Sequence, residues 1–389
     1  MYIQNIQPGE KTEKGISLFI SSQKHNIMKK IIKQVLGVDV AQNELVVCLG
    51  RMYDDWSPEL YAHQVFANNK KGFAKLIGWV KKNTESGATV NFVMEATGVY
   101  HECFAYFLDE QNRAVSIVLP NKISNYMRTL DINTITDKTA SNAICQFGLE
   151  RKLEIWHKPD PTFKQMKQLT RERDQIVEER TSCKNQLHAE MAEAEPNKNS
   201  KKRLEERIKL MDKQEGQINA ELKQIVSSDA EIKENIKLLC TIPGIGNLTA
   251  CTILAETNGF DLIRNKKQLT SYAGLDVREK LSGTSVKGKP RISKKGNRFL
   301  RKAMHLPALA AIRHNERYKA IFTRIVQKQG IKMKAAVAVQ RKLLELAFIL
   351  FKSRKPFDQD LFMKPAVTEP TTAKLEKEAV EIQTTSFAV

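Results

Sequence analysis

Three acidic residues have surroundings that suggest a chemical role. Asp39 interrupts the apolar segment LGVDVA, and Glu95 closes the apolar segment VNFVME. Both segments have the Val-rich character of buried strands, where a carboxylate is unfavourable unless a cation compensates its charge. Asp137 precedes the helical pattern KTASNAICQFGLE. By itself Asp137 is best explained as a helix cap, because a carboxylate there suits the positive end of the helix dipole.

Together the three acids predict a phosphoryl-transfer centre. Clustered carboxylates of the RNase H type hold two divalent ions about 4 Å apart, which activate a nucleophile and stabilise the leaving oxygen. Oxygen ligands of this kind favour Mg²⁺ or Mn²⁺ over zinc. An acid within a strand, one at a strand end and one at a helix start have the order that such a centre requires. We therefore predict a site for Mg²⁺ (or Mn²⁺) formed by Asp39, Glu95 and Asp137.

The most charge-dense segment, residues 278–302, contains ten Lys or Arg and one acid in 25 residues. These cations repel one another unless a polyanion lies among them, and such loops contact phosphates through charge and backbone amides. A serine in such a loop, here Ser282, is most often a turn residue. It can also attack a phosphodiester where metals and cations stabilise the developing charge. The predicted nucleic-acid contacts are Arg278, Lys280, Lys287, Lys289, Arg291, Lys294, Lys295, Arg298 and Arg301.

A glycine-rich turn, PGIG, precedes the apolar helical segment NLTACTILAE. In the helix-hairpin-helix motif such a turn offers its amides to a phosphate. Gly244 and Gly246 are therefore predicted nucleic-acid contacts. The motif is short, so its specificity is low.

An α/β domain has to position the acids. The segment IIKQVLGVDVAQNELVVCLG predicts two strands with a turn at residues 41–44, and HQVFANN predicts a third strand. Helical and strand patterns then alternate up to RAVSIVLP, a strand that Pro120 closes. Strands that begin as a hairpin and then alternate with helices predict an α/β domain with a mixed sheet over residues 31–160.

The rest of the folded chain is predicted to be mainly helical. Residues 161–232 contain two helical patterns on either side of a break at Pro196 and Asn197. They predict either a solvated antiparallel hairpin within one chain or, as the favoured interpretation, a coiled-coil arm that joins subunits. Residues 233–356 predict a mainly α C-terminal domain that contains the basic loop.

The two ends are expected to lie outside the folded part. Residues 1–30 are polar and irregular and have no signal-peptide pattern, so we interpret them as a disordered extension with Met28 as the functional start. Residues 357–389 carry six acids and three lysines without periodicity and are expected to form a disordered tail. The expected location is the bacterial cytoplasm, in association with the nucleoid.

The composition favours a polyanionic partner. Lys and Arg number 63 against 44 acids, which gives a formal charge of +19. No apolar run approaches the ~20 residues that a membrane span needs. The six cysteines and seven histidines have no zinc-ligand spacing. The sequence has no helix-turn-helix or zinc-finger pattern either, so direct base readout by the protein is not indicated.

Five segments resemble those of one known family. GVDVAQNEL, VMEATGVY, TDKTAS, CTIPGIGNLTA and SYAGLDVREKLSGTSVKGKPRISKKGNRFLRKAMHLPA are similar to segments of the insertion-sequence transposases of the IS110 class. That class includes Piv-type invertases and bridge-RNA-guided recombinases. The similarity covers about residues 33–355. It implies a RuvC-like DEDD domain, a coiled-coil linker and a C-terminal transposase domain with a catalytic serine.

The resemblance also implies a mechanism. Asp39, Glu95 and Asp137 match the first three acids of the family motif, and Ser282 matches its serine. In such proteins a structured non-coding RNA, encoded beside the gene, pairs with target and donor DNA. Subunits assemble as homodimers and then as a homotetramer. The serine of one subunit joins the metal site of another and forms a phosphoserine link to the cleaved DNA.

The fourth acid of the family motif does not match. The family usually has Asp three residues after the third acid, where this chain has Ala140 followed by Ser141. A subgroup works with three carboxylates, or Asp131 or Ser141 substitutes through water, or this copy is impaired, or the residue was engineered. One helical turn separates Asp137 from Ala140, so a carboxylate there would face the same metal pair. Its loss is expected to weaken metal binding more than it alters the fold.

The leading hypothesis is an RNA-guided DNA recombinase or transposase that uses Mg²⁺ and a serine nucleophile. Its expected partners are double-stranded target and donor DNA, a structured guide RNA and further copies of the chain, with no membrane. One alternative is a RuvC-like junction-resolving nuclease, in which activated water attacks and Ser282 only contacts phosphate. The other is a catalytically impaired nucleic-acid-binding relative, which Ala140 suggests.

Overall fold

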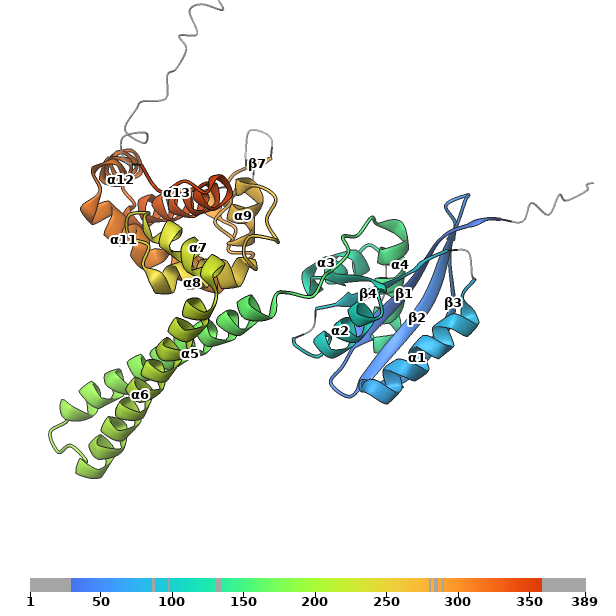
Figure 1. The fold of residues 1–389 in the computed structure, drawn as a ribbon, viewed down its shortest axis with the longest axis horizontal. Coiled ribbons are helices and arrows are strands. Elements are labelled where there is room, and N and C mark those ends of the chain that lie inside the picture. Colours follow the sequence, from blue (N-terminus) through green and yellow to red (C-terminus); the bar gives the residue numbers. More distant parts are fainter. Residues whose placement is uncertain are drawn as a thin grey trace, which may run out of the picture. The chain divides into compact units, whose positions relative to one another are not determined.

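The computed structural model describes residues 29–85, 88–96, 98–130, 134–279, 281–282, 286–288 and 290–358, without the side chains of Leu281, Ser282, Val286 and Lys287. The described residues form two compact units, one up to Lys158 and one from Pro159 on. The first combines a sheet with helices and the second is mainly helical (Figure 1). Most of the two predicted disordered ends, together with Met28 and Asp131, lies outside the described residues. None of the helices that are described is long and apolar enough to cross a membrane.

The N-terminal unit is built on a five-stranded sheet with the order β3-β2-β1-β4-β5. The first three strands pair antiparallel, whereas β4 and β5 run parallel to β1. The mixed α/β sheet that the sequence predicts is therefore confirmed, including the turn between the first two strands. The strands are β1 (Ile31–Val40), β2 (Glu44–Tyr53), β3 (Pro58–Ala67), β4 (Val90–Glu95) and β5 (Ala114–Val118).

Helices cover both faces of this sheet. One face packs against α1 (Lys70–Asn83) and α2 (Glu102–Glu110), and the other packs against α3 (Pro120–Met127) and α4 (Asp137–Glu150). The sequence pattern did not predict α3. Pro120 is the first residue of α3 rather than only the end of a strand, and proline suits that position because its missing amide hydrogen would have no partner there.

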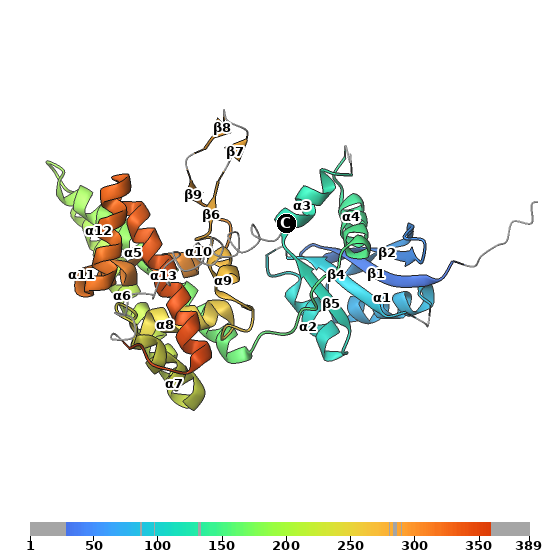
Figure 2. The same ribbon diagram turned by 90° about the horizontal axis from the view of Figure 1, so that it is seen from above.

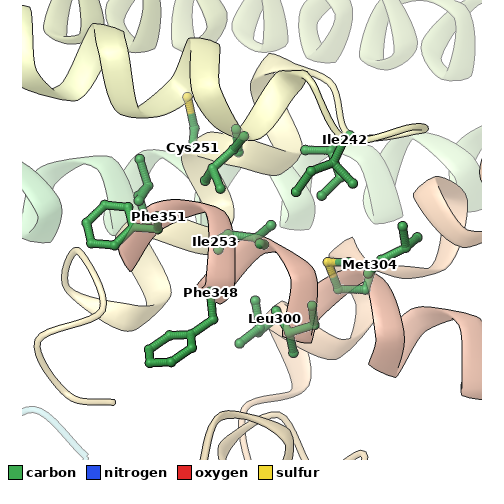
Figure 3. Packing of buried hydrophobic residues seen from close by; sticks show 14 of the residues in the cluster. Ile242, Cys251, Ile253, Leu300, Met304, Phe348 and Phe351 are labelled. Carbon is green, nitrogen blue, oxygen red and sulfur yellow. The ribbon is translucent and has the colours of Figure 1, made fainter. Parts of the chain in front are cut away.

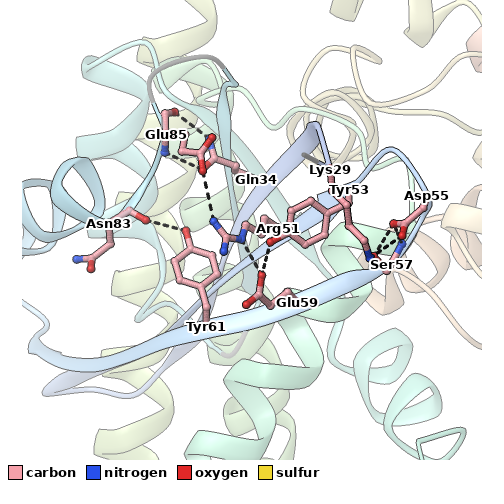
Figure 4. Close-up of polar contacts among 10 residues, drawn as sticks. All are labelled: Lys29, Gln34, Arg51, Tyr53, Asp55, Ser57, Glu59, Tyr61, Asn83 and Glu85. Carbon is pink, nitrogen blue, oxygen red and sulfur yellow. Dashed lines mark hydrogen bonds and ion pairs between the residues drawn. The ribbon is translucent and has the colours of Figure 1, made fainter. Parts of the chain in front are cut away.

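Polar contacts fix the end of the sheet where β1 begins (Figure 4). The Nε of Arg51 lies 2.8 Å from Oε2 of Glu59, and its guanidinium lies over the rings of Tyr53 and Tyr61 at 5.3 and 4.8 Å from the ring centroids. The side-chain amide of Gln34 both donates to and accepts from the backbone beyond α1. These contacts hold the edge strand β3 in place. The acidic residues lie at the other end of the strands.

The segment after α4 covers the opposite edge of the sheet. The backbone amide of Trp156 donates to the carbonyl of Val115 on β5 at 2.7 Å. The Trp156 ring stacks on Tyr106, with 5.7 Å between the ring centroids. The last segment of the N-terminal unit therefore covers the edge strand β5.

The C-terminal unit begins with two long antiparallel helices, which we call the helical arm (Figure 1). They are α5 (Pro161–Met191) and α6 (Lys198–Ser228). Arg173 and Arg180, which interrupt the apolar pattern of α5, both pair with Glu215 of α6. The two predicted helices and the break between them are confirmed as a hairpin within one chain. A coiled coil between subunits stays a prediction.

The remaining helices form a core around α13. Its residues Leu343, Leu344 and Ala347 are fully buried. Figure 3 shows Phe348 and Phe351 of the same helix in this apolar cluster, which also includes Met166 and Leu169 at the base of α5. The arm and the core therefore share one interior. The helices are α7 (Ala230–Cys240), α8 (Asn247–Thr257), α9 (Lys266–Tyr272), α10 (Arg298–Ala303), α11 (His305–His314), α12 (Glu316–Gln329) and α13 (Lys332–Ser353).

The basic loop is a two-stranded ribbon that projects from this core (Figure 2). At its base β6 (Val277–Arg278) pairs antiparallel with β9 (Arg291–Ile292), and further out β7 (Leu281–Ser282) pairs with β8 (Val286–Lys287). We call residues 277–292 the basic ribbon. The sequence pattern predicted the charge of this segment but not its strands.

Candidate active site and nucleic-acid interface

Asp39 and Glu95 end two neighbouring parallel strands side by side. The register pairs Val38 of β1 with Met94 of β4, so the next residue on each strand is the acid. Both acids lie on the sheet face that α4 covers, because alternate residues of a strand share a face. Adjacent strands lie about 4.8 Å apart, so the register alone brings these two carboxylates together.

Close packing of α4 on β1 brings Asp137 to the same edge. A Cβ on Gly37 would lie 2.3 Å from the backbone nitrogen of Cys145 and 2.5 Å from the carbonyl oxygen of Ser141, so only glycine allows this approach. The sequence interpretation did not single out Gly37. Its signal was a glycine in the middle of an otherwise Val-rich strand, which often marks a close backbone approach.

The start of α4 is fixed by its own cap. Thr136 accepts a hydrogen bond from the backbone amide of Thr139, and the Thr139 hydroxyl accepts one from the amide of Thr136. Asp137 is therefore the first helical residue and not the cap that its position alone suggested. Its carboxylate is exposed and is not used for capping.

Asp39 is influenced by the other two carboxylates. Burial raises the pKa of Asp39 to about 6, and the charges of Asp137 and Glu95 add to the rise. The groups interact through space without converging, since within the described part of the chain no three His, Cys, Asp or Glu side chains are placed to hold a metal ion. Carboxylate oxygens are the donors that a hard divalent cation prefers, and a cation beside Asp39 would offset the nearby negative charge.

The position of the missing fourth acid lies in the first turn of α4. Ala140 is half-buried there, one turn after Asp137. The neighbouring Ser141 is fully buried, and its hydroxyl donates to the carbonyl of Lys138 at 2.9 Å. Ser141 is thus engaged within the helix, which argues against it as a substitute ligand.

The basic ribbon brings like charges together. Arg278 and Arg291 are direct cross-strand partners, and both are exposed. Like charges in such a pair are destabilising unless an anion lies between them. Lys294 and Lys295 are also exposed, and none of these four cations forms an ion pair with another described residue. Of the other predicted contacts, Lys280 and Lys289 lie outside the described residues, and only the backbone is described for Ser282 and Lys287.

The base of the ribbon is held by polar contacts. Ser293 donates its amide to the Asp276 carbonyl at 2.8 Å and its hydroxyl to the Asp276 carboxylate at 2.5 Å. Lys294 donates its amide to the carbonyl of Gly274 at 3.1 Å. A Cβ on Gly296 would lie 2.4 Å from the carbonyl oxygen of Tyr272. The ribbon therefore leaves the helical core from a tightly packed base.

The remaining predicted contacts differ in their surroundings. Arg298 is exposed, 4.8 Å from the ring centroid of Phe299, whereas Arg301 donates to the carbonyl of Ala273 at 2.8 Å. Gly246 has open space where a side chain would be. Gly244 has a φ of +86°, and a Cβ there would lie 2.3 Å from the carbonyl oxygen of Pro307. Packing against α11 thus explains the glycine at 244 without a phosphate.

Models of known families match both units. A model of the IS110 DEDD transposases matches residues 36–196, and a model of the transposase IS116/IS110/IS902 family matches residues 236–323. The chain belongs to the IS110 family of transposases. The resemblance seen in its motifs is therefore confirmed, and the protein is a DNA transposase/recombinase enzyme.

The transposase is 28% identical over 332 residues to the pilin gene-inverting protein of Moraxella bovis, which covers 84% of this chain and 98% of that protein. It is 21% identical over 375 residues to the transposase for insertion sequence element IS1111A of Coxiella burnetii, with 88% of this chain and 95% of that protein covered. Among solved structures, T. thermophilus RuvC in complex with a Holliday junction substrate has a TM-score of 0.25 and 8% identity. That match covers 32% of this chain and 99% of RuvC.

Proposed function

We propose that this transposase cuts and rejoins DNA strands with the carboxylates of Asp39, Glu95 and Asp137 and the hydroxyl of Ser282, at sites chosen by a structured guide RNA. The observation that carries the proposal is the placement of the three acids. The strand register puts Asp39 beside Glu95, and the glycine contact of α4 adds Asp137. The fold thus holds the half-buried Asp39 near two further carboxylates, whose charges add to the rise of its pKa.

The three carboxylates would hold Mg²⁺ or Mn²⁺. When bound, such an ion supplies Lewis-acid stabilisation of the charge that develops on the phosphoryl oxygens. The chain's own residues set the site: β1 and β4 fix two carboxylates, and the capped first turn of α4 fixes the third. Asp39 is only half-buried, so its carboxylate is accessible to a substrate.

Ser282 supplies the nucleophile. Its hydroxyl oxygen forms a bond to phosphorus while the bond from phosphorus to the leaving strand end breaks. The serine proton passes to a base, and the leaving oxygen takes up a proton. The DNA then stays joined to Ser282 as a phosphoserine ester until a free strand end attacks the phosphorus and releases the serine. Bonds are exchanged one for one, so no oxidant or further substrate is needed.

The basic ribbon supports this role for Ser282. Its strands place the cross-strand pair Arg278 and Arg291 at the base of the same ribbon that carries Ser282 further out. A phosphate between the two guanidinium groups would remove their repulsion. A DNA backbone held between these two arginines would lead the scissile strand along the ribbon to Ser282.

We assign the parts of the chain accordingly. Residues 31–160 are a RuvC-like catalytic domain, and residues 233–356 are the transposase domain that presents Ser282. Residues 161–232 are an arm through which subunits join as dimers and tetramers, so that the serine of one subunit meets the carboxylates of another. The transposase works in the bacterial cytoplasm, in association with the nucleoid.

Trapping of a covalent intermediate tests the nucleophile. Reaction of the transposase with donor and target DNA in Mg²⁺ should give a protein–DNA adduct on denaturing gels. Ser282→Ala should abolish the adduct, whereas the control Ser285→Ala, three positions further along the sequence, should retain it. Cleavage by Ser282→Ala at the wild-type rate would overturn the serine mechanism and favour a RuvC-like nuclease in which water attacks.

Guidance by RNA has its own test. The transposase purified from its host should carry one discrete RNA encoded beside its gene, which sequencing of the bound RNA identifies. Random degradation fragments would contradict this part of the proposal. They would leave the serine chemistry untouched, because the adduct experiment does not depend on the source of the RNA.

Ala140 supports a second candidate, a nucleic-acid-binding relative with impaired catalysis. A carboxylate restored in the first turn of α4 would share the cation with Asp137. Under this second hypothesis the wild type should cleave no DNA in Mg²⁺, whereas Ala140→Asp should cleave it. Addition of Mg²⁺ should also raise the melting temperature of Ala140→Asp more than that of the wild type. Cleavage by the wild type rejects this hypothesis.

A further inference from the structure

Glu256 is a charged residue in the interior of the C-terminal unit that the proposed chemistry does not use. Its side chain lies on α8 and is fully buried. The carboxylate accepts two hydrogen bonds from Arg171, from Nε at 2.7 Å and from Nη2 at 2.8 Å. It accepts a third from the side-chain amide of Asn297 at 2.6 Å. One buried carboxylate thus joins α8 to two other segments.

Asn297 is the residue through which the basic ribbon returns to the core. It directly precedes α10, and its side-chain oxygen caps that helix by accepting from the amide of Leu300 at 2.9 Å. Its backbone amide donates to the carbonyl of Tyr272 at 2.6 Å. The Tyr272 hydroxyl in turn donates to the carbonyl of Glu256 at 2.8 Å. The return path of the ribbon is therefore fixed from several directions.

Arg171 is the corresponding contact on the arm. It lies near the base of α5, and its guanidinium is 4.4 Å from the ring centroid of Phe299 on α10. Close by, Nζ of Lys302 on α10 lies 2.6 Å from both Asp174 and Glu178 on α5. The arm is thus tied to the helix that follows the ribbon at three successive points.

The chemistry of these contacts favours positioning over simple stability. An apolar set of similar volume packs about as well as a buried ion pair, whereas a carboxylate with three directed hydrogen bonds allows a single arrangement of its partners. Arg171 binds both carboxylate oxygens in a fork, and Asn297 shares one of them. A rotation of α5 against α10 would break these hydrogen bonds.

We propose that Glu256 is a positioning residue that holds the helical arm and the basic ribbon as one body, so that the orientation of the arm sets the orientation of the ribbon that bears Ser282. The proposal rests on the proposed function in one respect, that the ribbon takes part in strand cleavage. Glu256 acts through Arg171 and Asn297 and does not itself contact DNA.

Two variants separate this role from a general role in folding. Glu256→Gln removes the charge that Arg171 requires. Asn297→Ser is milder, because serine still caps α10 while the amide donor to Glu256 is lost. The matched control is Arg341→Gln: Arg341 pairs with Glu345 within α13, and its side chain is 39% exposed, as is that of Arg171. Melting temperatures establish which variants fold.

Hydrogen exchange is the first readout, because it does not depend on catalysis. The amides of residues 291–297 should exchange about tenfold faster in both variants than in the wild type, and at the wild-type rate in Arg341→Gln. If the ribbon base exchanges at the wild-type rate in the folded Asn297→Ser variant, Glu256 does not hold the ribbon, and the proposal is wrong whatever happens to Glu256→Gln.

The adduct assay is the second readout. In the folded variants the rate of protein–DNA adduct formation should fall about tenfold while the Kd for DNA stays within about twofold. A loss of adduct in proportion to unfolded protein would reduce Glu256 to a stability residue and overturn the proposal. If the variants exchange faster as expected but the wild type forms no adduct, the serine mechanism is refuted. Glu256 would then still be the residue that joins the arm to the ribbon.

Discussion

Asp39 combines the two effects that raise the pKa of a carboxyl group, burial and nearby like charge. Its pKa of about 6 lies above the ordinary value of about 3.8, so folding favours the protonated form of Asp39 relative to the unfolded chain. The resulting stability is fully present below about pH 4 and is lost as the pH rises through 6. At neutral pH the ionised carboxylate therefore opposes folding when no cation is bound.

Asp39→Asn should consequently stabilise the metal-free protein at pH 7. The shift corresponds to about 3 kcal/mol at most, and partial exposure of the group reduces the expected gain in unfolding free energy to about 1–2 kcal/mol. Denaturant unfolding in EDTA at pH 4 and pH 7 measures it, and the gain should be absent at pH 4. The control is Asp55→Asn, because Lys29 and Ser57 hold the pKa of exposed Asp55 below its usual range. Equal gains at both pH values would refute the electrostatic explanation.

Gly37 should tolerate no side chain. The Cβ of Gly37→Ala would meet the backbone of α4, so the helix has to move away from the sheet, at a cost of about 1–3 kcal/mol in unfolding free energy. Gly78 of α1 is the matched control, because a Cβ there meets nothing within 4 Å. Gly78→Ala should stabilise by up to about 1 kcal/mol through its effect on helix propensity. Thermal unfolding of the two variants decides the question, and similar effects at both positions would contradict it.

Single residues differ in how much of their role the sequence reveals. Asp39 and Glu95 stand out in the sequence because each is a charge in a Val-rich segment, and their catalytic role stays a prediction. Gly37 was missed because its contact with Cys145 depends on how a helix about 100 residues further along the chain packs against the strand. For Gly244 a local motif predicted a phosphate contact, which stays a prediction, and the structure adds a packing reason for glycine in its contact with α11. Glu256, within the apolar segment ILAETNGF, had the same signal as Asp39 and was not used.

Elements were predictable where their period was long enough to see. The strands of the sheet and the two helices of the arm each show at least five residues of regular pattern. The two-residue strands of the basic ribbon are too short for any alternation, so the ribbon was expected only as a charged loop. Arg173 and Arg180 looked like defects in the pattern of α5 because their partner Glu215 lies on the other helix.

The cross-strand arginines of the basic ribbon allow a prediction about binding. The double variant Arg278→Gln, Arg291→Gln should bind nucleic acid more weakly and should reduce the slope of log K against log salt by about 1.4–1.8, the value for two phosphate contacts. The melting temperature should not fall, because the change removes a repulsion. Salt titrations monitored by fluorescence anisotropy provide the slope.

Lys237→Gln is the matched control for this experiment. Lys237 is exposed on α7, outside the basic ribbon, and pairs with Glu234 at 2.7 Å. Its removal should leave the salt slope unchanged. If both changes reduce the slope equally, binding follows the overall charge and the ribbon has no special part in it.

At the scale of the whole molecule, the two units have separate interiors. The apolar clusters of the sheet domain and of the helical domain share no residue. We therefore expect residues 29–158 to fold alone and the full chain to unfold in two calorimetric transitions. The Asp39→Asn gain should appear only in the transition that the isolated sheet domain reproduces. A single transition that both units share would contradict this independence.

The net charge is also distributed unevenly along the chain. Of the formal charge of +19, residues 278–302 contribute +9, whereas residues 357–389 contribute −3. The amino-acid composition predicted a polyanionic partner, and the segment was located from the sequence. The geometry of that segment could not be predicted, because its base is held by contacts with Tyr272 of α9 and the residues just after it, and its return by contacts with α5 and α8.

The length of α5 gives its contact with Glu256 a mechanical consequence. Between Arg171 and the end of the helix at Met191 the arm extends about 30 Å, so a rotation of about 10° at Arg171 displaces the tip by about 5 Å. Conversely, when the tip moves by about 5 Å, which is more than one base-pair step, the arm rotates at Arg171 by only about 10°. If the arm and the ribbon move as one body, as proposed, a force applied at the tip acts on the ribbon through a lever of about 30 Å.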